Sequence, residues 1–170
     1  MLRRGFLASA ALLTLAACAP TVQSALSPGL SFGGPRLEEN VFVSFDGARL
    51  GLTVWPARGG EPTAVIVALH GMNDYAAAFG LAASAWARMG ITTYAYDQRS
   101  FGDAPNTGIW PGTDALTADM RTAAKLVRRR HPDLPLILLG ESMGGAVIMA
   151  ALAEQDLPEA SGIVLVAPAG

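Results

Sequence analysis

Short apolar stretches that alternate with helical stretches are the feature that most restricts the folds open to this chain. Four stretches have the composition of strands: Val65–Leu69, Ile91–Tyr96, Leu136–Leu139 and Ile163–Val166. Helices are expected between them at residues 75–89, 114–130 and 143–154, the first closed by Gly90 and the second capped by Thr113. Because a continuously apolar strand needs cover on both faces, this order predicts an α/β fold with a mostly parallel sheet and helices on both faces.

An antiparallel hairpin is expected ahead of the first of these strands. Val41–Phe45 and Leu50–Trp55 have the residue types of strands, and Asp46-Gly47 lies between them. Glycine accepts the positive φ that tight hairpin turns require. We therefore expect an antiparallel edge on the sheet, contributed by the N-terminal side of the domain.

One glycine-rich turn carries the pattern of a catalytic nucleophile. Gly140-Glu141-Ser142-Met143-Gly144 directly follows an apolar strand and directly precedes a helical stretch. The pattern G-x-S-x-G alone is weak, but a strand–turn–helix context holds the serine in a strained conformation with its hydroxyl exposed above the sheet. The helix N-terminus stabilises negative charge that develops beside it. We interpret Ser142 as a nucleophile; a glycine-rich turn with a capping serine is the alternative.

A second loop fits the same chemistry. His70-Gly71-Met72-Asn73 directly follows Val65–Leu69. In hydrolases of this construction, that loop donates one N–H to the oxyanion hole and the residue after the nucleophile donates the other. The predicted donors are the backbone N–H groups of Met72 and Met143. His70 precedes the nucleophile, whereas the catalytic base follows it in this chain order, so we interpret His70 as shaping the loop.

Three stretches together resemble the α/β-hydrolase family, and within it the monoacylglycerol lipase and lysophospholipase branch, also called serine aminopeptidase-like. They are His70–Met72, Asp97–Gly102 and Gly140–Gly145. The resemblance covers residues 39–170 and implies the fold and acyl-ester chemistry without specifying a substrate. It also implies that Asp97 and Arg99 brace neighbouring loops. The family pattern D-x-R-G-x-G has Ser100 in place of its first glycine here.

The N-terminus resembles a bacterial lipoprotein signal peptide. Arg3 and Arg4 precede an apolar run that ends in Leu15-Ala16-Ala17-Cys18, similar to a lipobox, and Cys18 is the only cysteine of the chain. The resemblance implies removal of residues 1–17 and lipidation of Cys18. The stretch that follows is rich in proline, serine, glycine and alanine and has little periodicity, which predicts a flexible tether over residues 18–38. It implies a membrane anchor in the bacterial cell envelope, on the outer membrane or the periplasmic face. A secretory signal with an incidental cysteine is the alternative.

Composition excludes several other classes of protein. The net charge is −2, and 15% of the residues are charged, which argues against a nucleic-acid partner. One cysteine and two histidines argue against a zinc site built from these ligands. The acyl-ester chemistry implied above involves no metal and no organic cofactor.

The base and acid of a serine hydrolase are not evident after the nucleophile. No histidine follows Ser142, and Glu154, Asp156 and Glu159 fall in or just after its helix. We therefore expect residues 39–170 to be the N-terminal part of an α/β-hydrolase domain, incomplete at its C-terminus and inactive alone. The complete domain is expected to be a serine hydrolase that cleaves small-molecule or lipid carboxylic esters through an acyl-enzyme. The alternatives are an aminopeptidase or amidase on the same fold, or a non-catalytic lipid-anchored binding module.

Overall fold

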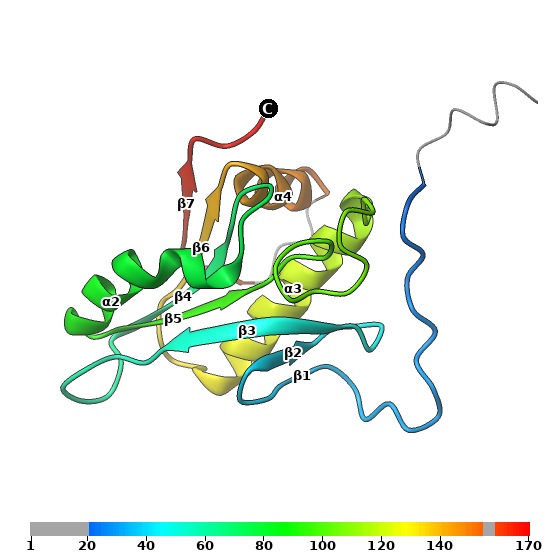
Figure 1. Cartoon of the computed structure of the whole chain (residues 1–170). Coiled ribbons are helices and arrows are strands. Elements are labelled where there is room, and N and C mark those ends of the chain that lie inside the picture. The colour runs from blue at the N-terminus through cyan, green and yellow to red at the C-terminus, as the bar shows by residue number, and fades with distance from the viewer. Residues whose placement is uncertain (1–20, 155–158) are drawn as a thin grey trace, which may run out of the picture.

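A computed structural model describes residues 21–154 and 159–170, and its centre is one mixed sheet (Figure 1). The strands are β1 (Arg36–Leu37), β2 (Val41–Val43), β3 (Arg49–Trp55), β4 (Ala64–Leu69), β5 (Ile91–Tyr96), β6 (Leu136–Glu141) and β7 (Gly162–Val166). The helices are η1 (Ala76–Phe79, a 3₁₀ turn), α2 (Gly80–Arg88), α3 (Thr113–Arg130) and α4 (Met143–Ala153). The predicted signal peptide, residues 1–17, and Cys18 lie outside the described residues.

The order of strands in the sheet confirms the predicted fold class. The described strands follow the order β1-β2-β3-β5-β4-β6-β7. β5, β4, β6 and β7 are parallel, whereas β2 and β3 form the antiparallel hairpin and β3 pairs with β5 in the antiparallel sense. Gly47 adopts φ 85° in the hairpin turn, as its place there predicted. Within the expected tether, Arg36–Leu37 pair with β2, so the sheet begins before residue 39.

Two helix predictions need correction at their N-termini. The helix expected at residues 75–89 is divided into η1 and α2, and only the second is α-helical. The prediction that Thr113 caps α3 is wrong, because Thr113 is already the first helical residue. Gly112 takes the capping position with φ 80°, so no side chain caps the helix. A sharp entry into the helix at positive φ favours glycine there over a side-chain cap.

The helices cover both faces of the sheet, and alternate residues of each central strand supply the two cores. On β4, Val65, Val67 and Leu69 pack in the cluster that α3 and α4 cover. Ile66 and Ala68 point to the other face and pack under η1 and α2. Successive side chains of a strand point to opposite faces, so this burial explains why β4 is apolar at every position.

The fold brings three loops to one edge of the sheet. Parallel strands end at the same edge, so the segments after β4, β5 and β6 are neighbours there. These segments contain the three stretches on which the resemblance depends, including Ser142 directly after β6. No helix within residues 21–154 and 159–170 is both long and apolar enough to cross a membrane.

Candidate active site

Ser142 occupies a strained turn between β6 and α4. Its backbone has φ 48° and ψ −113°, a sparsely populated region that costs a non-glycine residue about 1–3 kcal/mol. Its side chain is partly exposed and makes no capping hydrogen bond to α4. The geometry is therefore that of a serine presented to solvent, and the alternative of a capping serine does not fit it.

Close backbone approaches around this turn require its glycines. A Cβ on Gly140 would lie 2.5 Å from the carbonyl oxygen of Gly144, and one on Gly145 would lie 2.8 Å from the Pro168 Cβ. A Cβ on Gly144 would lie 2.6 Å from the carbonyl carbon of Leu69. Real side chains cannot approach so closely, so these residues hold the start of α4 against the end of β4.

The loop after β4 lies beside the serine hydroxyl. A Cβ placed on Gly71 would be 3.4 Å from the Ser142 Cβ and 3.9 Å from its Oγ. The Met72 side chain is 58% exposed, whereas that of Met143 is buried. The two side chains thus differ in their surroundings, and the property predicted for both residues is the backbone N–H. The N–H of Met143 is the first of α4, where N–H groups have no acceptor within the helix. The structure thus places one donor predicted for the oxyanion hole at this helix end, and the other on the neighbouring loop.

His70 is buried and holds two loops together. Its Nδ1–H donates to the carbonyl of Gly71 (2.7 Å), and its Nε2 accepts a hydrogen bond from the Gln98 backbone N–H (2.9 Å). The Gln98 side-chain amide donates to the His70 carbonyl (2.6 Å). Burial lowers the pKa of the imidazole below its ordinary value of 6.5. Both ring nitrogens are occupied, which confirms the interpretation of His70 as a residue that shapes the loop.

The other histidine lies at the opposite edge of the sheet. His131 follows α3 and its Nε2 hydrogen-bonds the hydroxyl of Tyr94 (2.8 Å). It precedes β6, whereas Ser142 follows β6, and six strand residues extend about 20 Å. Glu154, at the far end of α4, pairs with Arg121. Among the described residues, which include both histidines of the chain, no imidazole lies where it could activate Ser142.

Asp97 braces the loop after β5, as the resemblance implied. Its Oδ1 accepts a hydrogen bond from the Ala76 N–H (2.7 Å) and its Oδ2 accepts one from the Asp103 N–H (2.8 Å). Gly102 leaves room for this carboxylate, since a Cβ there would lie 2.5 Å from Asp97 Oδ1. Ser100 replaces the family's glycine yet adopts φ 76°, so the left-handed turn is kept.

Arg99 braces two further loops from a buried position. Its guanidinium donates to Asp46 (2.7 and 2.8 Å) and to Asp119 (2.7 and 2.8 Å), and Ser44 also donates to Asp119. Burial opposes the charge on Asp46, but hydrogen bonds from Arg99 and two backbone N–H groups lower its pKa overall. Burial raises the pKa of Asp119 despite its bonds to Arg99. The network ties the β2–β3 turn to α3 and the loop after β5.

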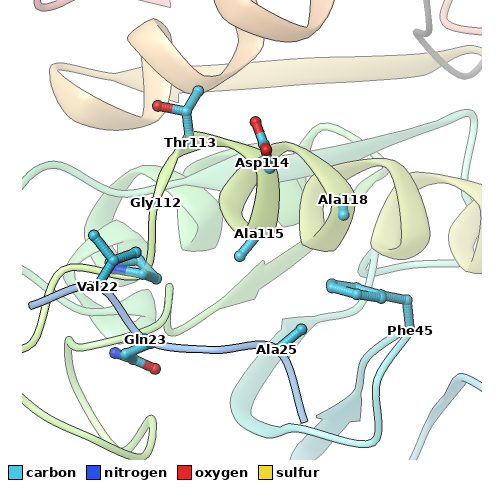
Figure 2. A pocket seen from close by; sticks show the side chains of 10 residues that line it. Val22, Gln23, Ala25, Phe45, Gly112, Thr113, Asp114, Ala115 and Ala118 are labelled. Carbon is cyan, nitrogen blue, oxygen red and sulfur yellow. The ribbon is translucent and has the colours of Figure 1, made fainter. Parts of the chain in front are cut away.

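Ser142 does not line the hollow shown in Figure 2. The hollow has a volume of about 560 Å³ and lies between the N-terminal segment, Phe45 in the β2–β3 turn and the start of α3. Its lining includes Val22, Ala25, Phe45 and Ala115, and is mainly apolar. Within the described part of the chain, no cluster of three or more histidine, cysteine or acidic side chains could hold a metal ion.

Comparison with known proteins supports the family assignment. The model of the family described as serine aminopeptidase, S33, matches residues 60–170. A monoacylglycerol lipase of Mycolicibacterium smegmatis is 31% identical over 132 residues, which are 77% of this chain and 46% of that protein. Phospholipase YtpA of Bacillus subtilis is 28% identical over 123 residues, 68% of this chain and 44% of that protein. The chain thus spans less than half the length of these relatives.

Solved structures support the same fold. A thermostable carboxyl esterase from Bacillus coagulans superposes with a TM-score of 0.64 at 25% identity, over 75% of this chain and 43% of that one. A monoglyceride lipase variant from Saccharomyces cerevisiae gives a TM-score of 0.63 at 21% identity, over 85% of this chain and 48% of that one. The chain therefore belongs to the serine aminopeptidase S33 family, and its fold is that of the α/β-hydrolases.

Proposed function

We propose that Ser142 is the nucleophile of a serine hydrolase that acts on carboxylic esters. The observation that carries this proposal is the strained, partly exposed Ser142 at the start of α4, with Gly71 beside its hydroxyl. The Oγ would attack the ester carbonyl carbon, and the displaced electron pair would move to the carbonyl oxygen. The backbone N–H groups of Met72 and Met143 would stabilise that oxyanion. The alcohol would leave with a proton, and water would then hydrolyse the acyl-enzyme.

The base that activates Ser142 would come from a further part of a longer protein, together with the acid that orients it. Both histidines of this chain are engaged elsewhere, and the relatives are more than twice as long as the matched stretch. In addition, Ile163–Val166 of β7 are 36–45% exposed although all four are apolar. An apolar strand is normally covered by a neighbouring strand or helix, so the exposure of β7 indicates that such a neighbour belongs beside it. Residues 39–170 would then be the N-terminal part of the domain, with little turnover on their own.

The substrates would be small-molecule or lipid esters met at a membrane. The relatives named as monoacylglycerol lipase and phospholipase act on lipid esters, and this supports a similar substrate class. Cys18 in its lipobox-like sequence would carry acyl groups after removal of residues 1–17. The segment after Cys18 would link it to the domain, whose sheet begins at Arg36–Leu37. The protein would reside in the bacterial cell envelope, on the outer membrane or the periplasmic face.

Turnover of matched substrates tests the reaction class. The protein translated from the whole gene is assayed with p-nitrophenyl butyrate, monooleoylglycerol and an aminoacyl p-nitroanilide, beside Ser142→Ala. We expect hydrolysis of the two esters and its loss in Ser142→Ala. Preferential cleavage of the anilide would favour an aminopeptidase, a candidate that the family description supports. Binding of substrate without any turnover would favour the non-catalytic lipid-anchored module.

A further inference from the structure

Gln23 attaches the N-terminal segment to the loop after β5 by hydrogen bonds from both its backbone and its side chain. The backbone N–H of Gln23 donates to the carbonyl of Trp110 (2.9 Å). Its side-chain amide donates to Ser100 Oγ (2.6 Å) and to the carbonyl of Ile109 (2.6 Å). One side chain thus contacts both ends of this loop, although it lies more than 75 positions away in sequence.

The serine that departs from the family pattern supplies one of these contacts. Ser100 is buried, and its hydroxyl accepts the hydrogen bond from Gln23 and donates one to Ile109. A glycine at this position would keep the turn but would offer no hydroxyl to Gln23. The strained φ of 76° at Ser100 is therefore accompanied by a contact that glycine could not make.

A second attachment follows three residues later. The N–H of Leu26 donates to Asp46 Oδ2 (2.9 Å), and Asp46 is itself fixed by the buried Arg99. Val22 also packs against the loop, since a Cβ on Gly112 would lie 3.3 Å from its Cγ1. We call residues 22–26 the strap, because they are bound to the domain at both ends.

The strap shortens the distance by which the domain could move away from a lipid anchor on Cys18. Only three residues separate Cys18 from Val22. An extended chain spans at most about 3.5 Å per residue, so the four steps between them cover roughly 14 Å. If the tether were free to residue 38, the domain could move several times farther from the lipid. With the strap bound, Val22 and the loop beside it stay close to the headgroups.

The strap and the loop beside it together expose an apolar, uncharged surface. Val22 is 48% exposed, Ile109 40% and Trp110 39%. Tryptophan favours the membrane interface, where its ring is in an apolar region and its N–H is hydrated. Residues 100–115 contain Asp103 and Asp114 but no lysine or arginine, which disfavours attraction to anionic lipid.

We propose that the strap and the loop containing Ile109 and Trp110 dock on a zwitterionic lipid surface. This loop follows β5 at the same sheet edge as Ser142, so docking would turn that edge toward the membrane, where lipid esters reside. The inference rests on the proposed lipidation of Cys18, and it deepens the proposed function by assigning the orientation of the anchored domain.

Depth-dependent fluorescence quenching tests the docking. The full chain, made in a bacterium that processes lipoproteins, is reconstituted in phosphatidylcholine vesicles whose acyl chains carry bromine, which quenches tryptophan on contact. We expect quenching that is lost in Trp110→Phe and kept in the matched control Trp86→Phe on α2. In Gln23→Ala the protein should stay on the vesicles with an unchanged circular dichroism spectrum, while the quenching falls at least twofold. Added phosphatidylglycerol should not increase it.

The outcomes separate the docking from the proposals beneath it. Unquenched Trp110 in a chain whose N-terminal peptide carries acyl groups by mass spectrometry would overturn the docking alone, and the loop would then face solvent or a protein partner. Equal quenching in Gln23→Ala would overturn the role of the strap. A chain without acyl groups on Cys18 would overturn both the anchor and the docking. None of these outcomes depends on hydrolysis at Ser142, which is measured separately.

Discussion

Gly144 lies so close to Leu69 that a Cβ on the glycine would come within 2.6 Å of the leucine carbonyl carbon. The first turn of α4 is thereby pressed against the end of β4. This contact sets Ser142 next to the loop that begins at His70, although the two follow different strands. It therefore sets the distance between the proposed nucleophile and a proposed oxyanion donor, which have to act on the same carbonyl group.

Gly144→Ala should lower the free energy of unfolding by about 3 kcal/mol, since the new methyl group overlaps backbone that cannot move aside. Chemical denaturation of the purified protein measures this. Gly33→Ala is the matched control, because nothing lies within 4 Å of a Cβ at that position. A loss below about 0.5 kcal/mol in Gly144→Ala would contradict the close contact.

Gly71→Ala should keep the fold but slow the reaction of Ser142. The methyl group would lie 3.4 Å from the serine Cβ, an ordinary contact, yet 3.9 Å from Oγ, where a carbonyl group has to enter. In the protein translated from the whole gene, we expect an unfolding midpoint close to that of the unaltered protein and at least tenfold slower acylation by a p-nitrophenyl ester. Unchanged acylation would show that this loop does not border the reacting group.

Arg99→Met should cost about 4 kcal/mol of unfolding free energy, because it leaves Asp46 and Asp119 buried without their cation. Arg49→Met is the comparison, since its pair with Glu38 is exposed and should contribute nothing measurable. Equal stability of the two variants in urea would show that the buried network is not what joins the β2–β3 turn to α3.

Acidification should destabilise the protein as the pH falls below about 6.5. The pKa of His70 is lower in the folded state than its ordinary value of 6.5, so the unfolded chain binds more protons in this range and gains stability relative to the native state. Protonation of Nε2 would also break the hydrogen bond from Gln98. We expect the unfolding free energy to fall between about pH 7 and pH 5. Stability that rises or stays level over that range would be the contrary result.

The variant His131→Gln separates the two histidines in that titration. Burial also lowers the pKa of His131, so it contributes to the slope in the same direction. The decrease in unfolding free energy on acidification that remains in His131→Gln is attributed mainly to His70. A further His70→Gln substitution should remove it.

The strand pattern and the turn at Ser142 were accessible from sequence because each depends on residues that are neighbours in the chain. The apolar run of β4 predicts its burial on both faces, and the glycines around Ser142 predict a sharp turn after β6. The division of residues 75–89 into η1 and α2 was not accessible. At the start of η1, the N–H of Ala76 donates to Asp97, which lies 21 positions further along the chain in the loop after β5, a contact that no local pattern indicates.

The attachment of Gln23 to Ser100 also could not be predicted from sequence. A segment rich in proline, serine and glycine has no periodicity that indicates a partner. Apart from the Ser100 hydroxyl, Gln23 contacts loop carbonyls, which every residue possesses. The only available signal was Ser100 itself, a serine where the family pattern has glycine. Likewise, Gly112 caps α3 in place of Thr113 because the loop enters the helix at positive φ.

Covalent labelling by a fluorophosphonate tests the central claim most directly. The reagent forms a bond from an activated serine Oγ to phosphorus and releases fluoride, and mass spectrometry locates the adduct. In the protein translated from the whole gene, we predict an adduct on Ser142 that is absent in Ser142→Ala and retained in Ser161→Ala, whose hydroxyl accepts a hydrogen bond from the start of β6. An unlabelled Ser142, or an adduct confined to another serine, would contradict its assignment as the nucleophile.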